Sequence, residues 1–133
     1  MVEHFCEPAQ SITHRHGFEI HQSWQDWLVV LSVDGEVDMV TAPHLGRAIC
    51  EALERSATAL VIDLTEVTFL ASVGMSVLVA AQEAADAMAV RFAVVADGAV
   101  TRRPIRLLGL DAVLALHSTR DDALRALRRE ARS

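Results

Sequence analysis

One segment, residues 61–79 (VIDLTEVTFLASVGMSVLV), constrains the fold of this chain more than any other. It starts within a run of buried-strand character, residues 60–64, which ends at the polar pair Asp63 and Thr65. After a short connection, a helical apolar pattern runs from Val73 to about Ala87, and the expected buried stripe comprises Met75, Leu78, Val79 and Ala85. A buried strand that leads into such a helix is the repeating unit of α/β domains.

Ser72 lies where the connection becomes the helix. A serine hydroxyl at that point can cap the helix by accepting a backbone hydrogen bond. It can also be an exposed acceptor for a phosphoryl group, because helix N-termini favour added negative charge. The sequence leaves both roles open.

Strand patterns also precede this segment. Residues 27–33 are rich in β-branched and aromatic side chains and predict a strand. Residues 18–23 predict a second, weaker strand, with a hairpin turn between the two at Gln25-Asp26. Asp34-Gly35 predicts a further turn. Thr41 is a good N-cap for a helix whose buried face comprises Ala42, Leu45, Ile49, Ala52 and Leu53.

Alternation continues to the end of the chain. Residues 90–95 predict a strand buried on both faces, residues 99–108 a short helix and residues 113–116 a short strand. Asp121 and Asp122 open a last helix. Such alternation implies parallel strands with right-handed crossovers, whereas the two opening strands are expected to be antiparallel. The predicted fold class is α/β, with one mixed, mostly parallel β-sheet and about four helices packed over it.

Length and charge limit the functional classes. The chain has 133 residues, enough for one domain, which we place at residues 17–130 after a flexible arm over residues 1–16. A net charge of −6 argues against nucleic-acid partners. The sequence shows neither a secretory signal nor a membrane-spanning run, so we expect a cytoplasmic protein without membrane insertion. Cys6 and Cys50 are expected to be reduced thiols there.

Patterns for catalysis or metal binding are missing. The glycines are scattered and form no phosphate-binding loop, and Ser72 lacks the glycine pair of a nucleophile elbow. Histidines gather in or near the N-terminal arm, but without metal-site spacing. Asp34, Glu36 and Asp38 alternate in what we interpret as an ordinary acidic loop. We therefore expect no enzyme, no metal and no cofactor.

Two segments together resemble the STAS domain family, and in particular the bacterial anti-sigma factor antagonists. Residues 35–43 (GEVDMVTAP) are similar to the family's G-E-[LV]-D followed by T-A and the first helix. Residues 63–75 (DLTEVTFLASVGM) are similar to its D-L-S/T-x-V-x-F-x-D-S-S-G-L. Residues 104–110 (PIRLLGL) are a weaker match to its late helix and glycine turn. The resemblance covers about residues 16–130.

The resemblance also implies a site. Ser72 aligns with the family's phosphorylated serine, whereas the acidic residue before it is Ala71 here and the second serine is Val73. The implied phosphoacceptor is Ser72. The implied partner-binding residues are Asp38, Thr41, Ala71, Ser72, Val73, Gly74 and Met75. For three of these residues a purely structural role is the alternative to partner binding: a turn or capping acid for Asp38, close helix–sheet packing for Gly74 and a core position for Met75.

The function implied by the resemblance is transcription regulation. An anti-sigma factor antagonist binds an ATPase-type anti-sigma factor, a serine kinase, and so frees a sigma factor. Phosphorylation of Ser72 would end that binding, and a phosphatase, as a further partner, would reset it. The alternative is a non-phosphorylatable STAS interaction module, such as an accessory subunit of a lipid-transport ATPase or a component of a stress complex. A nucleotide-binding sensor is a further rival.

Overall fold

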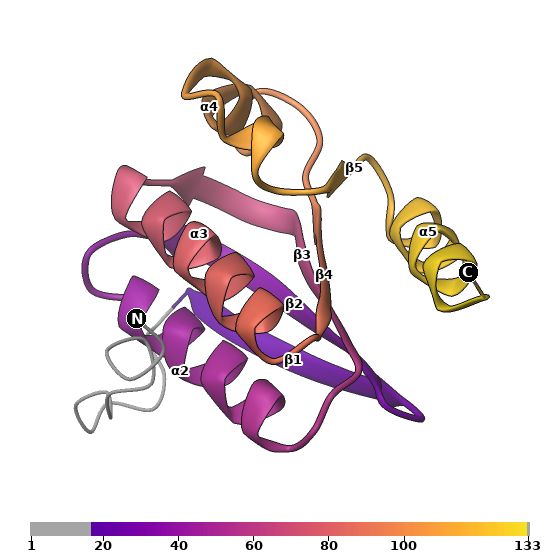
Figure 1. Cartoon of the computed structure of the whole chain (residues 1–133). Helices are drawn as coiled ribbons and strands as arrows, with labels where there is room; N and C mark the ends of the chain where they lie inside the picture. Colours follow the sequence, from indigo (N-terminus) through magenta and orange to yellow (C-terminus); the bar gives the residue numbers. More distant parts are fainter. Residues whose placement is uncertain (1–16, 133) are drawn as a thin grey trace.

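Five strands form a mixed sheet in the order β1-β2-β3-β4-β5 (Figure 1). β1 and β2 are antiparallel, and the other neighbours are parallel. The computed structural model describes residues 17–132, so the predicted N-terminal arm lies outside it. The strands are β1 (Phe18–Gln25), β2 (Leu28–Val37), β3 (Ala59–Leu70), β4 (Arg91–Val95) and β5 (Leu116–His117). The helices are α2 (Ala42–Glu54), α3 (Ser72–Ala87), α4 (Arg102–Leu107), the 3-10 turn η1 (Leu110–Ala112) and α5 (Arg120–Arg132).

The β1–β2 hairpin turns where the sequence predicts it. Gln25 pairs with Leu28, and Asp26 takes a positive φ of 58°, a conformation that aspartate tolerates better than most residues. Both tryptophans lie at this end. The Trp24 ring stacks under the Arg55 guanidinium, whose central carbon is 4.7 Å from the ring centroid, and Trp27 is exposed. The hairpin thus fixes one end of the sheet.

The predicted turn at Asp34-Gly35 is wrong, because β2 passes straight through it. The register between β2 and β3 shifts beside these residues, between Ser32 and Asp34 and again between Gly35 and Glu36. Gly35 has a φ of 112°, and a Cβ built on it would lie 1.9 Å from the Gly17 carbonyl oxygen. The glycine therefore marks an irregular, closely packed point within the strand rather than its end.

β3 is longer than the sequence predicts, extending to Leu70 instead of Leu64. The six added residues were expected to belong to the connection before α3, because the polar pair Asp63 and Thr65 marked the end of the strand. In the structure Val67 and Leu70 are buried, while Thr65, Glu66, Thr68 and Phe69 are exposed. Beyond Asp63, β3 pairs only with β2, since β4 ends opposite Asp63. A strand paired on one side can carry the polar residues that suggested a loop.

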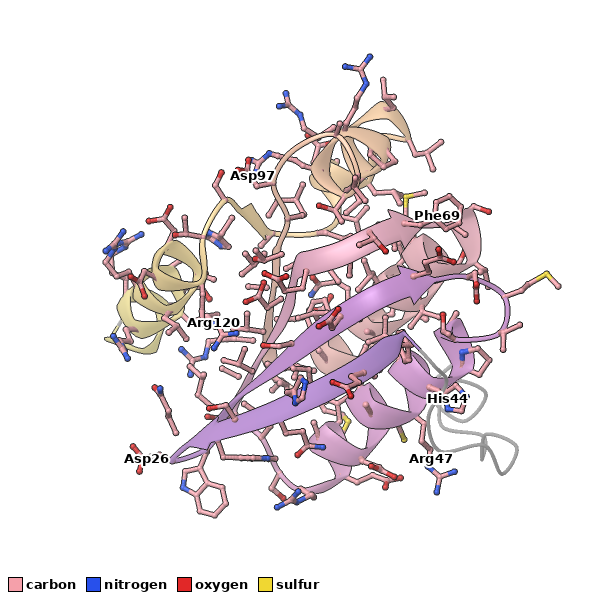
Figure 2. The ribbon with its side chains drawn as sticks, turned by 180° about the vertical axis from the view of Figure 1, so that it is seen from behind. Asp26, His44, Arg47, Phe69, Asp97 and Arg120 are labelled. Carbon is pink, nitrogen blue, oxygen red and sulfur yellow. The ribbon has the colours of Figure 1, made fainter. Side chains whose placement is uncertain are left out.

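Helices cover both faces of the sheet unequally. α2 and α3 lie side by side on one face (Figure 1), over the larger hydrophobic core. α5 covers part of the other face with Ala123, Leu124 and Leu127, which pack on a smaller cluster from β2, β3 and β4. Figure 2 shows the rest of that second face, where β1 and β2 carry polar side chains. Apolar side chains on both faces of β3 explain the continuous buried run that marked it in the sequence.

The remaining predicted elements are present with shifted bounds. The predicted buried face of α2 is confirmed at all five positions. On α3, Met75, Leu78 and Ala85 are buried as predicted, but Val79 is only half-buried. α4 is shorter than predicted, and β5 starts three residues later and ends one residue later than predicted, at Leu116–His117. α5 begins at Arg120, next to the predicted acidic pair.

Candidate functional site

Ser72 is the first residue of α3, and its side chain is exposed. Ala71 is the N-cap residue, with extended backbone at φ −79° and ψ 164°, and no side chain caps this helix. Of the two roles that the sequence leaves open for Ser72, capping is excluded, because the helix begins one residue earlier than that role requires. The Ala71 amide donates to the Val37 carbonyl oxygen at 2.9 Å, which ties the start of α3 to the end of β2. The Ser72 hydroxyl is presented to solvent from a fixed position.

The loop between β2 and α2 is organised by Asp38. Its Oδ1 accepts from the backbone amides of Val40 at 2.9 Å and Thr41 at 3.0 Å, and its carbonyl accepts from the Ala42 amide at 2.8 Å. These bonds make Asp38 a capping acid for the turn that enters α2. The interpretation of Asp38 as a turn acid agrees with these bonds, and its half-buried side chain can contribute to a surface through the atoms that remain exposed.

Thr41 is buried and takes the predicted N-cap position without capping the helix. Its Oγ1 accepts from the Asp38 amide at 2.9 Å and donates to the Glu36 carbonyl at 2.7 Å. The threonine therefore closes the loop from inside. It lies in the predicted partner-binding set, but it can affect a partner only by fixing the shape of this loop.

Gly74 and Met75 also lie in the interior. A Cβ on Gly74 would be 2.6 Å from Val37 Cγ1 and 2.9 Å from Leu70 Cδ1, so the glycine permits close packing of α3 on the sheet. Met75 is 5% exposed and belongs to the larger core. Of the predicted partner-binding residues, only Ser72 is in the exposed class, and Asp38, Ala71 and Val73 are half-buried.

A shallow groove of about 390 Å³ runs beside the exposed face of α3. Ser72, Ser76, Val79 and Glu83 line one wall, and Leu108 and Leu110 from the turn after α4 line the other. Ser72 and Ser76 are one helical turn apart, so both hydroxyls lie along this wall. The groove joins the serine to a region of the chain about 35 residues later in the sequence.

Exposed apolar side chains surround the Ser72 end of the sheet, and the sequence analysis missed them. Met39 is 79% exposed and Phe69 51% exposed, and Val40 and Leu108 are exposed as well. Phe69 lies near the carboxyl end of β3, and Met39 lies two residues beyond the end of the adjacent parallel strand β2. No sequence pattern marks Phe69 as exposed, because its neighbours are the polar Thr68 and the apolar Leu70. Apolar clusters of this kind mark interaction surfaces.

The described residues also bear on metal binding, membrane spanning and the state of the cysteines. Within residues 17–132, no group of three or more histidine, cysteine or acidic side chains is arranged to hold a metal ion. No helix in this described part is long and apolar enough to cross a membrane. Cys50 is buried on α2 and is disulfide-bonded, which contradicts the expected reduced thiol. Cys6 lies outside the described residues.

Several known proteins with similar sequences and structures are anti-sigma factor antagonists. The chain is 50% identical over 101 residues to the anti-sigma-F factor antagonist RsfB of Mycobacterium tuberculosis, a match that covers 76% of this chain and 82% of RsfB. An anti-sigma factor antagonist from Mycobacterium paratuberculosis has a TM-score of 0.80 at 45% identity and covers 88% of this chain and 99% of that one. Unphosphorylated SpoIIAA, also an anti-sigma factor antagonist, shares the fold with a TM-score of 0.68 at 20% identity, over 84% of this chain and 96% of that one.

These relatives are named for a regulatory role and not for a reaction, in agreement with the prediction of a protein that is not an enzyme. The sequence profile of the STAS domain family matches residues 19–123, which is most of the described chain. The predicted fold class, with its mixed sheet and packed helices, agrees with these neighbours. The chain therefore belongs to the STAS domain family.

Proposed function

We propose that this chain is a cytoplasmic anti-sigma factor antagonist that binds an ATPase-type anti-sigma factor and thereby frees a sigma factor. Phosphorylation of Ser72 by that partner ends the interaction, and a phosphatase restores it. The likeness to RsfB supports the antagonist role. The observation that carries the switch is the exposed Ser72 hydroxyl at the first residue of α3, beside the exposed apolar side chains of Met39 and Phe69.

The surroundings of Ser72 suit a protein partner. Methionine and aromatic side chains are enriched at interfaces, where burying them supplies most of the binding free energy. Met39, Val40 and Phe69 are exposed at the carboxyl edge of the sheet, and the groove beside α3 adds Leu108. A partner that covers this edge would bury the serine at the same time, so a change at the serine would act directly on the interface.

A phosphate at Ser72 is large enough to act as a switch. It adds about −1.5 to −2 units of charge, and the start of α3 tolerates that charge because of the helix dipole. Each unit charge about 4 Å from a partner carboxylate costs about 4 kcal/mol at an effective dielectric near 20. Changing a bound fraction from 99:1 to 1:99 needs about 5.5 kcal/mol. The phosphate would therefore release the partner without unfolding the helix.

Ala71 and Val73 favour the alternative function. The resemblance places an acidic residue at 71 and a second serine at 73, and this chain has neither. Ala71 is the N-cap residue, so its change from an acid removes both a charge and a possible backbone cap beside Ser72. A non-phosphorylatable interaction module, such as a lipid-transport ATPase accessory subunit or a stress-complex component, is consistent with that loss.

The test uses ATPase-type anti-sigma factors from the same genome, with Mg-ATP. Intact mass is recorded for the wild type, Ser72→Ala and the matched control Ser76→Ala, whose hydroxyl lines the same groove one turn later. We expect a gain of one phosphate, about 80 Da, on the wild type and the control but not on Ser72→Ala. Ser72→Asp should bind the partner at least tenfold more weakly than Ser72→Ala.

Each other result has a definite meaning. A stable complex without added phosphate would make the chain an unswitched antagonist. Phosphate on Ser72→Ala but not on Ser76→Ala would move the acceptor one turn along α3. If no anti-sigma factor binds and a transporter subunit co-purifies instead, the antagonist function is wrong and the alternative is favoured.

A further inference from the structure

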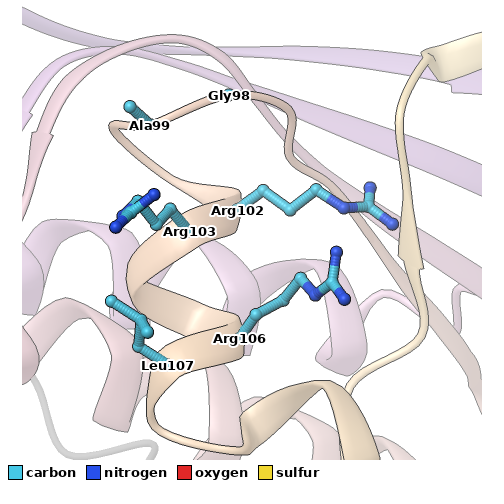
Figure 3. A pocket seen from close by; sticks show the side chains of 6 residues that line it. All are labelled: Gly98, Ala99, Arg102, Arg103, Arg106 and Leu107. Carbon is cyan, nitrogen blue, oxygen red and sulfur yellow. The ribbon is translucent and has the colours of Figure 1, made fainter.

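Three arginines on the short helix α4 line a second cavity, separate from the groove beside α3. The cavity has a volume of about 590 Å³ and is lined by Gly98, Ala99, Arg102, Arg103, Arg106 and Leu107 (Figure 3). This basic surface is unusual in a chain with a net charge of −6. We refer to these six residues as the α4 basic surface.

The three arginines differ in how many hydrogen bonds and ion pairs they form within the protein. Arg102 Nη1 donates to the Ala96 carbonyl at 3.0 Å and to Ser118 Oγ at 3.2 Å, so it braces α4 against the ends of β4 and β5. Arg106 Nε lies 3.9 Å from Asp111 Oδ2, a long and solvent-exposed ion pair. Arg103 is exposed and forms no ion pair with any residue that the structure describes. Arg103 is therefore the cation available to an outside group.

Exposed leucines link the arginines of the α4 basic surface to the groove at Ser72. Leu107 lines the basic cavity and is 73% exposed. Its neighbour Leu108 lines the α3 groove together with Ser72 and is 60% exposed. Arg103 and Leu107 project from the same side of α4 (Figure 3), as expected for residues four apart. One continuous surface therefore leads from the serine across two leucines to the arginines.

We infer that the α4 basic surface is the electrostatic half of the partner interface and binds an acidic segment of the anti-sigma factor. This inference rests on the proposed function. A small anion would need only the charges, whereas the exposed leucines beside Arg103 suit a partner that brings apolar and acidic side chains together. Charges at the rim of an interface mainly raise the association rate. Arg103 speeds encounter, and the leucines and the Ser72 edge hold the complex.

The test measures association rates with the anti-sigma factor that binds the wild type, at about 20 and 300 mM NaCl. Arg103→Glu should lower the association rate about tenfold at low salt and about twofold or less at high salt. The matched control is Arg128→Glu, an exposed arginine on α5, which should change the rate less than twofold. Leu107→Ser should raise the dissociation rate severalfold with little dependence on salt. Circular dichroism of each variant confirms folding.

If Arg103→Glu and Arg128→Glu lower the association rate equally, the effect comes from the net charge of the protein and not from the α4 basic surface, and the inference is overturned. An unchanged rate for Arg103→Glu would overturn it too, although the proposed function would stand because the wild type binds. A third outcome would also overturn the inference: pyrophosphate binds the free protein, Arg103→Ala abolishes that binding, and Arg103→Glu leaves the association rate with the partner unchanged. The α4 basic surface would then be a site for a small anion. If the wild type binds no anti-sigma factor, both proposals are wrong.

Discussion

Gly74 shows how one residue sets the distance between α3 and the sheet. Its missing side chain leaves room for Val37 and Leu70, both buried, and a Cβ would approach each to less than 3.0 Å. Val37 is β-branched and has little rotamer freedom to move away. At the residue scale, the glycine in the motif around Ser72 is thus explained by packing.

Gly74→Ala should lower the free energy of unfolding by about 1 kcal/mol. Overpacking costs about 1–3 kcal/mol, and the gain in helix propensity, at most about 1 kcal/mol, is smaller in a first turn. Urea unfolding measures the change. Ser76→Ala on the exposed side of the same helix should be neutral or slightly stabilising. A more stable Gly74→Ala protein would show that α3 can move outward freely.

At the element scale, α5 is attached to the sheet through a charged anchor. Arg120 donates to Asp63 Oδ2 from Nε at 3.0 Å and from Nη2 at 2.9 Å, and it also contacts Ser32. Asp63 is 6% exposed, and its other oxygen accepts from the Thr65 amide at 2.9 Å. Arg91 donates to the Leu127 carbonyl farther along the helix. The aspartate of the sequence motif therefore holds a helix and lies away from the proposed partner surface.

Arg120→Ala should lower the free energy of unfolding by about 2 kcal/mol, because it leaves a nearly buried carboxylate without its cation. Hydrogen exchange should accelerate in α5 before it does in α2 or α3. Arg125→Ala removes an exposed arginine paired with Asp122 on the same helix and should cost less than about 0.5 kcal/mol. Uniform acceleration across all helices would contradict a local anchoring role.

At the scale of the whole molecule, the second face of the sheet carries a row of carboxylates. Glu19 pairs with Asp34 across β1 and β2, and Asp34 pairs with Glu66 across β2 and β3. All three side chains are exposed on this face. Like charges on neighbouring strands repel, and the net charge of −6 adds to that repulsion.

Asp34→Asn should raise the free energy of unfolding by about 0.5 kcal/mol at low salt, and the gain should shrink at about 0.5 M NaCl. Thermal unfolding at several salt concentrations measures both effects. Glu83→Gln makes the same change in net charge on α3 and should give a smaller, less salt-dependent gain. Equal gains from the two variants would assign the effect to total charge instead of the row.

The sequence predicted elements well where a periodic apolar pattern was strong and poorly where two signals competed. The buried face of α2 followed directly from the spacing of its apolar residues, and the β1–β2 hairpin followed from two strand patterns on either side of Gln25-Asp26. Asp34-Gly35 looked like a turn, yet pairing on both sides carried β2 through it. The segment after Leu64 was interpreted as a connection because the polar pair Asp63 and Thr65 marked the end of the strand, although Val67 and Leu70 are buried. Local propensity could not show that β3 continues along β2 after β4 has ended.

The candidate site was predicted in part. Ser72 was found from its position between strand and helix and from the family motif. Its exposure required the structure, as did the burial of Thr41, Gly74 and Met75. Phe69 and the α4 basic surface were missed because exposed side chains carry no periodic signal, and their proximity to the serine depends on how the chain folds.

The position of the two tryptophans has an optical consequence. The chain contains two tryptophans and no tyrosine. The fluorescence that it emits on excitation at about 295 nm therefore comes from Trp24 and Trp27 at the hairpin. The hairpin lies at the amino end of β2, and Ala71 bonds to Val37 at the other end. Emission will therefore report on the Trp24–Arg55 contact and stay constant when the serine edge is covered. Any change of signal on mixing would belong to the partner's own fluorophores.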